Sequence, residues 1–318
     1  MLNLLTFGAR VKGTFLAASE ETDVLPWIKA IAWETDSDSV SETYASLGAA
    51  PRMVQWEDGP RPIEGVSEQS LLVPNVDWAN AVSISAKDFR RQKFGEFDRL
   101  VKDLANAGKT HPNELALTQI QAFETTITAY DGQLFFDTDH LSGDSGVQSN
   151  DLAPAAVAPA TPTVAEVRTA IFAAVAAQRG YLNDKGRPWA QGGGGSYIVL
   201  CPTNQLDVFT TAIFADVIQG TAGAIDNSLR KLKGTTFELV DDPTLTATWG
   251  TTAVQFGLIR VDGPGNAIVI QEEVPLTPDD AGINAHELFH FKRLVFGAQR
   301  SYNLLGLHWH KFVLSTFA

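Results

Sequence analysis

The clearest helical pattern in the chain lies in residues 87–107, KDFRRQKFGEFDRLVKDLANA. Apolar side chains recur there at spacings of three and four residues, which places them on one face of a helix: Phe97, Leu100, Val101 and Leu104. We expect this helix to end at Gly108, because glycine readily adopts the left-handed conformation that closes helices. A second helix is expected to follow, with Pro112 in its first turn.

The first 86 residues have a different pattern. Residues 1–50 mix short apolar and polar runs without a sustained period, which predicts an extended arm with at most one short helix; a frayed terminal tail is the alternative. Residues 51–86 contain a turn-rich tip, WEDGPRPIEGV, followed by alternation in SLLVPNVDWANAVSISA. This predicts a long two-stranded excursion, reaching roughly 40 Å if each strand has about 12 residues. An isolated hairpin of that length is marginal in water, so we expect a partner chain to complete it.

The second half of the chain reads as a compact α/β unit. The turn-rich residues 141–162 form the expected domain junction. Thr163 and Glu166 make a capping box before the helical run VRTAIFAAVAAQR. Four short apolar runs predict strands: SYIVLCP, TTFELVDDP, VQFGLIRV and NAIVIQEEV. Residues 285–318 return to a strand-like pattern.

Composition and charge narrow the class of protein. Hydrophobic residues make up 44% and charged residues 19%, which is typical of a globular chain. The formal net charge of -13 disfavours a primary role in gripping nucleic acid, since phosphate contacts need Lys and Arg. Cys201 is the single cysteine, so no intrachain disulfide is possible. We expect neither a signal peptide nor a membrane span, because no run of about 18 apolar residues occurs.

The segment HELFH matches the H-E-x-x-H signature of zinc hydrolases with His286, Glu287 and His290. That chemistry needs a helix, because only a helix brings both imidazoles to one metal ion. Pro278 and Gly282 upstream, and the alternation of apolar residues downstream, favour a strand instead, in which the two histidines would lie about 13 Å apart. Residues 291–318 also contain no Asp or Glu to serve as a third ligand. We therefore expect no enzyme activity and no metal, and keep a zinc metallohydrolase as the alternative from a different class.

Three further stretches have a structural interpretation that we favour. QGGGGS at 191–196 precedes a strand, whereas a phosphate-binding loop follows one, so we expect a flexible turn. DTDH at 137–140 has the composition of a turn, with a metal site as the alternative. Cys201 ends an apolar strand and is expected to be small apolar filler.

The order of these segments resembles a known family. Five runs carry the resemblance, in this order: YASLGAAPRMVQWEDGPRPI, VPNVDWANAVSISAKDF, FGEFDRLVKDLANAG, YDGQLFFDTDH and a tryptophan-bearing C-terminal strand. Together they are similar to the major head subunit of Mu-like phages and prophages, whose fold is the Hong Kong 97-type capsid fold. The resemblance covers most of the chain and is densest over residues 43–140.

The resemblance implies an α+β fold with named parts. Residues 1–50 would be an N-terminal arm and residues 51–86 an extended β-hairpin loop. The peripheral domain would comprise 87–154, with a long spine helix at 87–107, and the C-terminal strands 285–318. Residues 155–284 would be the axial domain. HELFH would then begin a strand of the peripheral sheet.

The resemblance also implies a function and its partners. The chain would be a structural major capsid protein that self-assembles through pentamers and hexamers into an icosahedral virion head around viral DNA, which it would contact non-specifically. Assembly would take place in the host cytoplasm, with a portal, possible decoration proteins and no cofactor. Because the chain begins almost directly at the arm, a separate scaffolding protein is expected. Expected contacts between subunits are Trp56, Arg61, Trp78, Phe97 and Leu104. An encapsulin-like shell or a gene-transfer particle is the alternative within the same fold.

We predict a shell without covalent cross-links. Some capsids of this fold join neighbours through an isopeptide bond formed by a lysine on the extended loop, and that nucleophile must be a neutral amine. Residues 30–86 contain no lysine, and Lys87 would belong to the spine helix. Arg52 and Arg61 cannot substitute, because a guanidinium stays protonated near neutral pH. Mature particles boiled in SDS should release a single band at the monomer mass, and a ladder of covalent multimers would contradict this.

Overall fold

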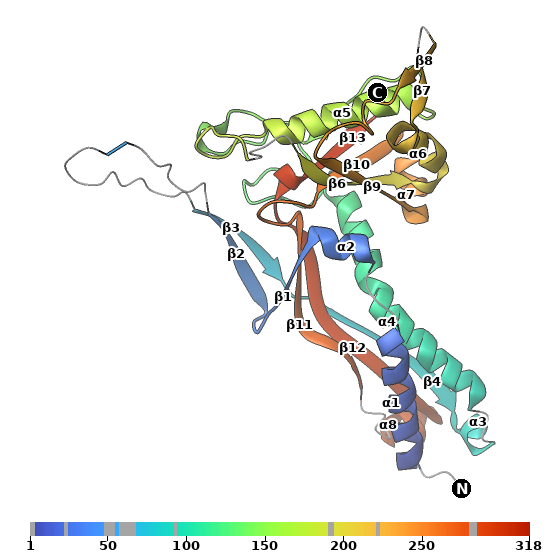
Figure 1. Ribbon diagram of the computed structural model, residues 1–318. Helices are drawn as coiled ribbons and strands as arrows, with labels where there is room; N and C mark the ends of the chain where they lie inside the picture. The colour runs from blue at the N-terminus through green and yellow to red at the C-terminus, as the bar shows by residue number, and fades with distance from the viewer. Residues whose placement is uncertain are drawn as a thin grey trace.

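The structure, a computed structural model, describes residues 4–21, 25–47, 55–56, 68–91, 94–189, 194–220, 223–279 and 285–318. Two parts are evident in Figure 1: an elongated lower part, which contains the N-terminus, and a compact upper part, which contains the C-terminus. A two-stranded ribbon projects to one side between them. No helix in the described ranges is both long and apolar enough to cross a membrane.

The elongated part is built on a four-stranded sheet. Its strands, in spatial order, are β1 (Ala32–Asp36), β11 (Ile268–Pro278), β12 (Arg293–Gly306) and β4 (Asp77–Ser85). Strand β1 runs parallel to β11, and the other neighbours are antiparallel. Helix α4 (Gly95–Ala122) packs along this sheet, with α1 (Leu4–Glu21) beside it and α2 (Pro26–Ile31) leading into β1. Two short helices, α3 (Ala86–Arg90) and α8 (Ala285–His290), lie at its far end.

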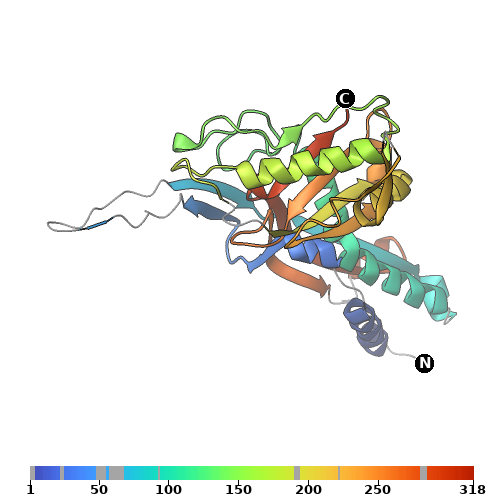
Figure 2. The ribbon, with the colours of Figure 1, turned by 45° about the horizontal axis from the view of Figure 1, so that its top comes forward.

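The compact part is built on a five-stranded mixed sheet. Its strands, in spatial order, are β5 (Asp151–Leu152), β13 (Phe312–Thr316), β10 (Gln255–Arg260), β6 (Gly195–Pro202) and β9 (Thr235–Asp242). Helix α5 (Val164–Gly180) lies across one face of the sheet, as Figure 2 shows. Helices α6 (Leu206–Phe214) and α7 (Pro243–Trp249), and the hairpin of β7 (Val217–Gly220) and β8 (Gly223–Asp226), complete this part. Its strands and helices share one large apolar core.

The segment predicted as an extended arm contains the long helix α1, the short helix α2 and the strands β1 and β2, which corrects the sequence interpretation. Helix α1 has 18 residues, and it buries a stripe of side chains at spacings of four, four and three: Phe7, Val11, Phe15 and Ala18. This stripe packs on Phe97 and Val101 of α4 in a second core cluster. The helix gains its stability from a partner far along the chain, so the local pattern alone is a weak signal.

The predicted spine helix at 87–107 is also corrected. Residues 86–90 form the separate helix α3, and α4 runs from Gly95 to Ala122 without stopping at Gly108. A Cβ on Gly108 would come 2.7 Å from Leu276 Cδ1, so this glycine allows the close approach of β11. Pro112 lies inside the helix. The helix continues through it because its two halves are buried in two different cores, which offsets the lost backbone hydrogen bond.

Several strands pair with partners outside the segment to which the sequence analysis assigned them. The ribbon joins β2 (Ser41–Leu47) to β3 (Glu68–Pro74), so it begins within the segment predicted as an arm. Strand β4, predicted as part of the excursion, pairs with β12 instead. Strand β11 belongs to the elongated sheet although it falls within residues 155–284, and β13 belongs to the compact sheet although it falls within 285–318. The capping box of Thr163 and Glu166 is present as predicted.

We predict that Phe15→Ala destabilises the unassembled chain by about 3–5 kcal/mol, because Phe15 of α1 is fully buried against α4 and Phe296. The matched control is Leu16→Ala, at a neighbouring position that is 44% exposed, and it should change stability much less. Chemical denaturation of both variants gives the comparison. Equal losses would mean that α1 is not packed on α4.

Candidate assembly surfaces

The β2–β3 ribbon has one face that the chain itself covers. Leu71 and Val73 of β3 are buried with Val269 and Leu307 in a small apolar cluster. The Tyr44 hydroxyl donates to Gln271 Oε1 at 2.9 Å, and Gln271 Nε2 donates to the Val73 carbonyl at 3.0 Å. These contacts hold the base of the ribbon against β11 and fix the direction in which it leaves the body.

The opposite face of the ribbon is open. On this face Leu72 is 60% exposed between its two buried neighbours. Val40, which precedes β2 and lies outside the strand, is 80% exposed. Within the described chain this ribbon contains only β2 and β3, so the outer edge of each strand lies outside its ladder. Unpaired strand edges and exposed aliphatic side chains are suited to contact with another chain. The ribbon is therefore the strongest candidate for an assembly surface.

Three partly exposed apolar side chains lie at the far end of the compact part, here called the tip. Phe214 at the end of α6, Val217 of β7 and Ile225 of β8 are between 41% and 52% exposed. In Figure 1 these elements lie together, on the side away from the ribbon. Ribbon and tip thus offer contact surfaces at opposite sides of the molecule.

The five residues expected at subunit contacts fall in different environments. Trp56 is 53% exposed, whereas Arg61 lies outside the described residues. Trp78 is partly buried, and its indole N–H donates to the Tyr302 carbonyl at 3.1 Å. Phe97 and Leu104 are only 3% and 4% exposed within the core shared by α1, α4 and β12. The expectation that these last two contact another subunit is corrected, because their surface is already covered by their own chain.

HELFH forms the six-residue helix α8 and not the predicted strand, which is a second correction at this end of the chain. Glu287 pairs with Arg293, at 2.6 Å between Oε2 and Nε, and this contact joins α8 to the start of β12. Phe289 and His290 are exposed. Across the described ranges, no three His, Cys, Asp or Glu side chains come together in a group that could hold a metal ion.

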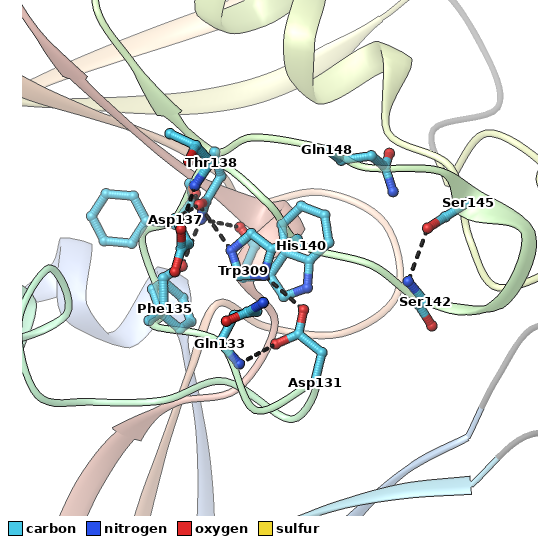
Figure 3. Close-up of polar contacts among 12 residues, drawn as sticks. Asp131, Gln133, Phe135, Asp137, Thr138, His140, Ser142, Ser145, Gln148 and Trp309 are labelled. Atoms are coloured by element: carbon cyan, nitrogen blue, oxygen red, sulfur yellow. Dashed lines mark hydrogen bonds and ion pairs between the residues drawn. The ribbon is translucent and has the colours of Figure 1, made fainter.

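The residues of DTDH and Cys201 make contacts within the fold of their own chain. Figure 3 shows His140 at the centre of a buried network. Its Nδ1 lies 2.7 Å from Asp131 Oδ2, its Nε2 lies 3.1 Å from Asn150 Oδ1, and its ring stacks on Trp309 at 4.0 Å between centroids. The Asp137 carboxylate accepts from the Thr138 amide at 2.7 Å. Cys201 is fully buried, and burial raises the pKa of its thiol to about 12.

Asn150 connects this network to the C-terminal segment. Its side-chain amide donates to the carbonyls of Phe135, Trp309 and Phe312 at 2.8 to 3.3 Å. The loop that follows α4 is thereby bound to the short helix and strand that end the chain. Sequence reasoning missed this site because its members come from three separate segments.

Two histidines and a lysine lie near this network, and their pKa values are lowered. Burial, together with the charge of Lys311, lowers the pKa of His308 to about 4. Complete burial, with His308 and Lys311 nearby, holds the pKa of His310 well below its ordinary value. The His310 ring stacks on Trp189 at 4.4 Å, and its Nδ1 has no hydrogen-bond partner within the described chain. Burial and Arg260 lower the pKa of Lys311 to about 8. Protonation of either histidine would place a new positive charge near the positive charge of Lys311.

We predict that acid loosens this junction. An unfolded chain protonates these histidines near their ordinary pKa of 6.5, whereas folded His308 resists protonation until about pH 4. Stability is therefore full above pH 6.5 and declines as pH falls towards 4, by at most about 1.4 kcal/mol per pH unit for each histidine. Thermal unfolding between these limits should depend less on pH in His308→Gln and His310→Gln than in the wild type. The exposed His290→Gln serves as the control, and a pH dependence unchanged in all three variants would contradict this account.

Comparison with known proteins gives a match to one protein family. Residues 6–161 match the family model described as "Mu-like prophage major head subunit gpT". The "Mu-like prophage FluMu major head subunit" of Haemophilus influenzae is 33% identical over 139 residues, which are 43% of this chain and 42% of that protein. The match thus spans less than half the length of this curated relative.

Solved structures extend the likeness over nearly the whole chain at the level of fold. A chain of the procapsid of bacteriophage JBD30 is 17% identical, with a TM-score of 0.51 over 98% of this chain and 75% of its own. A chain of the capsid of an empty GTA particle is 11% identical, with a TM-score of 0.51 over 92% of this chain and 96% of its own. Residues 6–161 are therefore similar to the Mu-like prophage major head subunit family, and the chain as a whole has the Hong Kong 97-type fold of phage capsid proteins.

Proposed function

We propose that this chain is a major capsid protein, whose copies assemble into a closed icosahedral shell around viral DNA. The observation that carries the proposal is the β2–β3 ribbon, which projects from the body with Leu72 and Val40 exposed. An isolated two-stranded ribbon is marginal in water, and a neighbouring subunit would cover its open face. The match of residues 6–161 to the major head subunit family and the shared fold support this proposal.

The two separated surfaces support a particular kind of contact. The ribbon and the tip with Phe214, Val217 and Ile225 lie at opposite sides of the chain and differ in structure. Contacts between unlike surfaces of identical subunits are heterologous, and they close into rings when the rotation allows it. We infer that such rings are the pentamers and hexamers of the shell, with the elongated part as peripheral domain and the compact part as axial domain.

Other components complete the proposed particle. We infer a separate scaffolding protein, a portal and assembly in the host cytoplasm, with a decoration protein as an optional addition. The role is structural, and no catalytic step is assigned to the chain. A gene-transfer particle is the second candidate, because the capsid chain of the empty GTA particle shares the fold over 92% of this chain. The nucleic acid packaged in native particles distinguishes the two: viral genomes in one case, host fragments in the other.

We predict that the purified full-length chain sediments as rings, shells or tubes and not only as a 34.4 kDa monomer. Leu72→Glu should reduce the assembled fraction at least about tenfold, because it places a charge on the open face of the ribbon. Leu72→Ile is the matched control, which keeps the apolar surface and should assemble normally. Sedimentation velocity and electron microscopy provide the readout, with circular dichroism as a check on folding. A monomer under all conditions would refute the proposed function.

A further inference from the structure

Positively charged side chains gather at α3 and the start of β12, which lie at the far end of the elongated part (Figure 1). Four exposed cations line one hollow there: Lys87, Arg90, Arg91 and Lys292. The remaining described residues that line it are Ser85, Ala86 and Phe291, so no carboxylate of the described chain lines the hollow. The chain as a whole carries a net charge of -13, which makes this end a local reversal of sign.

The cations are brought together by backbone structure. Strand β12 pairs with β4 so that Arg293 lies opposite Ser85, and the Ala86 amide donates to the Lys292 carbonyl at 2.7 Å. Lys292 has a φ of 49°, and it is the one non-glycine residue of the described chain with a positive φ. This left-handed conformation is rare for lysine and persists where surrounding contacts impose it. The turn therefore holds Lys292 beside α3.

Two acidic side chains at this end have hydrogen-bond or ion-pair partners. The Asp88 carboxylate accepts from the Ser85 hydroxyl at 2.6 Å, and Glu287 pairs with Arg293 at 2.6 Å. Among the described residues, none of the four cations takes part in an ion pair, in contrast to Arg293, Arg230 and Lys231. Four cations stand against the single carboxylate of α3, Asp88, so this end keeps a net positive charge, and a polyanion would relieve the repulsion between the cations.

We propose that this basic hollow binds the phosphate backbone of the duplex nucleic acid inside the shell. The proposal rests on the proposed function, which places DNA next to every subunit. A duplex carries one negative charge per about 1.7 Å of axis, so a single segment can meet all four cations. Lysine and arginine side chains at an exposed surface recognise phosphate without reading bases, so the contact is independent of sequence.

An acidic protein surface is the competing partner. Phe289 is 80% exposed and Phe291 is 57% exposed beside the hollow. A protein partner would use these rings together with the cations, since interfaces favour aromatic residues and arginine. Stacked base pairs in a duplex offer no comparable apolar surface to them. The observed lining favours phosphate, because one phenylalanine stands against four cations.

The test compares two full-length variants of equal charge. The first is Lys87→Gln, Arg90→Gln, Arg91→Gln and Lys292→Asn, with asparagine chosen because it tolerates the left-handed conformation. The control removes four exposed cations elsewhere: Arg99→Gln, Lys102→Gln, Arg230→Gln and Lys231→Gln. Fluorescence anisotropy of a labelled duplex of about 30 base pairs is measured between about 50 and 200 mM salt, the range over which phosphate contacts weaken steeply.

We expect the wild type and the control to bind with a slope of log affinity against log salt of about -3.6, that is, about 0.9 for each of four phosphates. The first variant should bind at least about tenfold more weakly at low salt, with a slope near zero. Equal binding by the first variant and the wild type, or an equal loss in the control, would overturn the proposal.

A second measurement separates this proposal from the protein alternative and from the proposed function itself. Shells of the first variant, assembled without nucleic acid, should form as readily as wild-type shells, and so should shells of Phe289→Ser. Loss of assembly in both variants would assign the hollow to a protein contact and overturn the proposal. If the wild type itself fails to assemble, the proposed function fails, whatever the duplex measurement gives.

Discussion

Both sheets of this protein depend on the last 26 residues of the chain, from Arg293 to Ala318. Strand β12 lies between β11 and β4 in the elongated sheet, and β13 lies between β5 and β10 in the compact sheet. Neither sheet can complete its hydrogen bonding before this segment arrives. Such non-local pairing costs loop entropy that only the finished core repays. The two parts are thereby coupled through one stretch of backbone.

The junction between β12 and β13 carries a set of specific polar contacts. Asn150 binds three backbone carbonyls there, and His140 stacks on Trp309 while facing Asp131. A buried polar network of this kind specifies one geometry, because each unsatisfied member would cost free energy. A shell of repeated subunits needs the elongated and compact parts to keep a defined relation. We infer that this network supplies it, while the ribbon and the tip face outward towards neighbours.

Sequence reasoning succeeded where the signal is local. The helix after Thr163 follows from a capping box whose two hydrogen bonds span three residues, and strands β6, β9 and β10 follow from short apolar runs. It failed where a distant partner decides the outcome. Helix α1 is stabilised by residues of α4 about 90 positions away, and α4 passes through Pro112 because two cores hold it. HELFH forms a short helix that the left-handed Lys292 then ends, which alternation alone does not reveal.

The candidate surfaces also combine features that the sequence shows with features that only the fold shows. The run KDFRRQK marks a basic segment in the sequence, but Lys292 joins it only through the register of β4 and β12. Phe97 and Leu104 have the spacing of a helix face, and the sequence does not tell whether that face meets its own chain or another. Exposure settles this point, since both are buried by α1 and β12. Leu72, which no pattern singled out, is the residue on which the ribbon's open face depends.

The most direct test of the account is hydrogen exchange of the backbone amides of β2 and β3 in free subunits and in assembled shells. The account predicts fast exchange in free subunits for amides on the outer edges of the ribbon, and strong protection of the same amides in shells, because a neighbour covers them. Amides of β6 and β10 in the compact core should be protected in both states. Shells in which the ribbon exchanges as fast as in the free chain would contradict the claim that the ribbon completes itself on a neighbouring subunit.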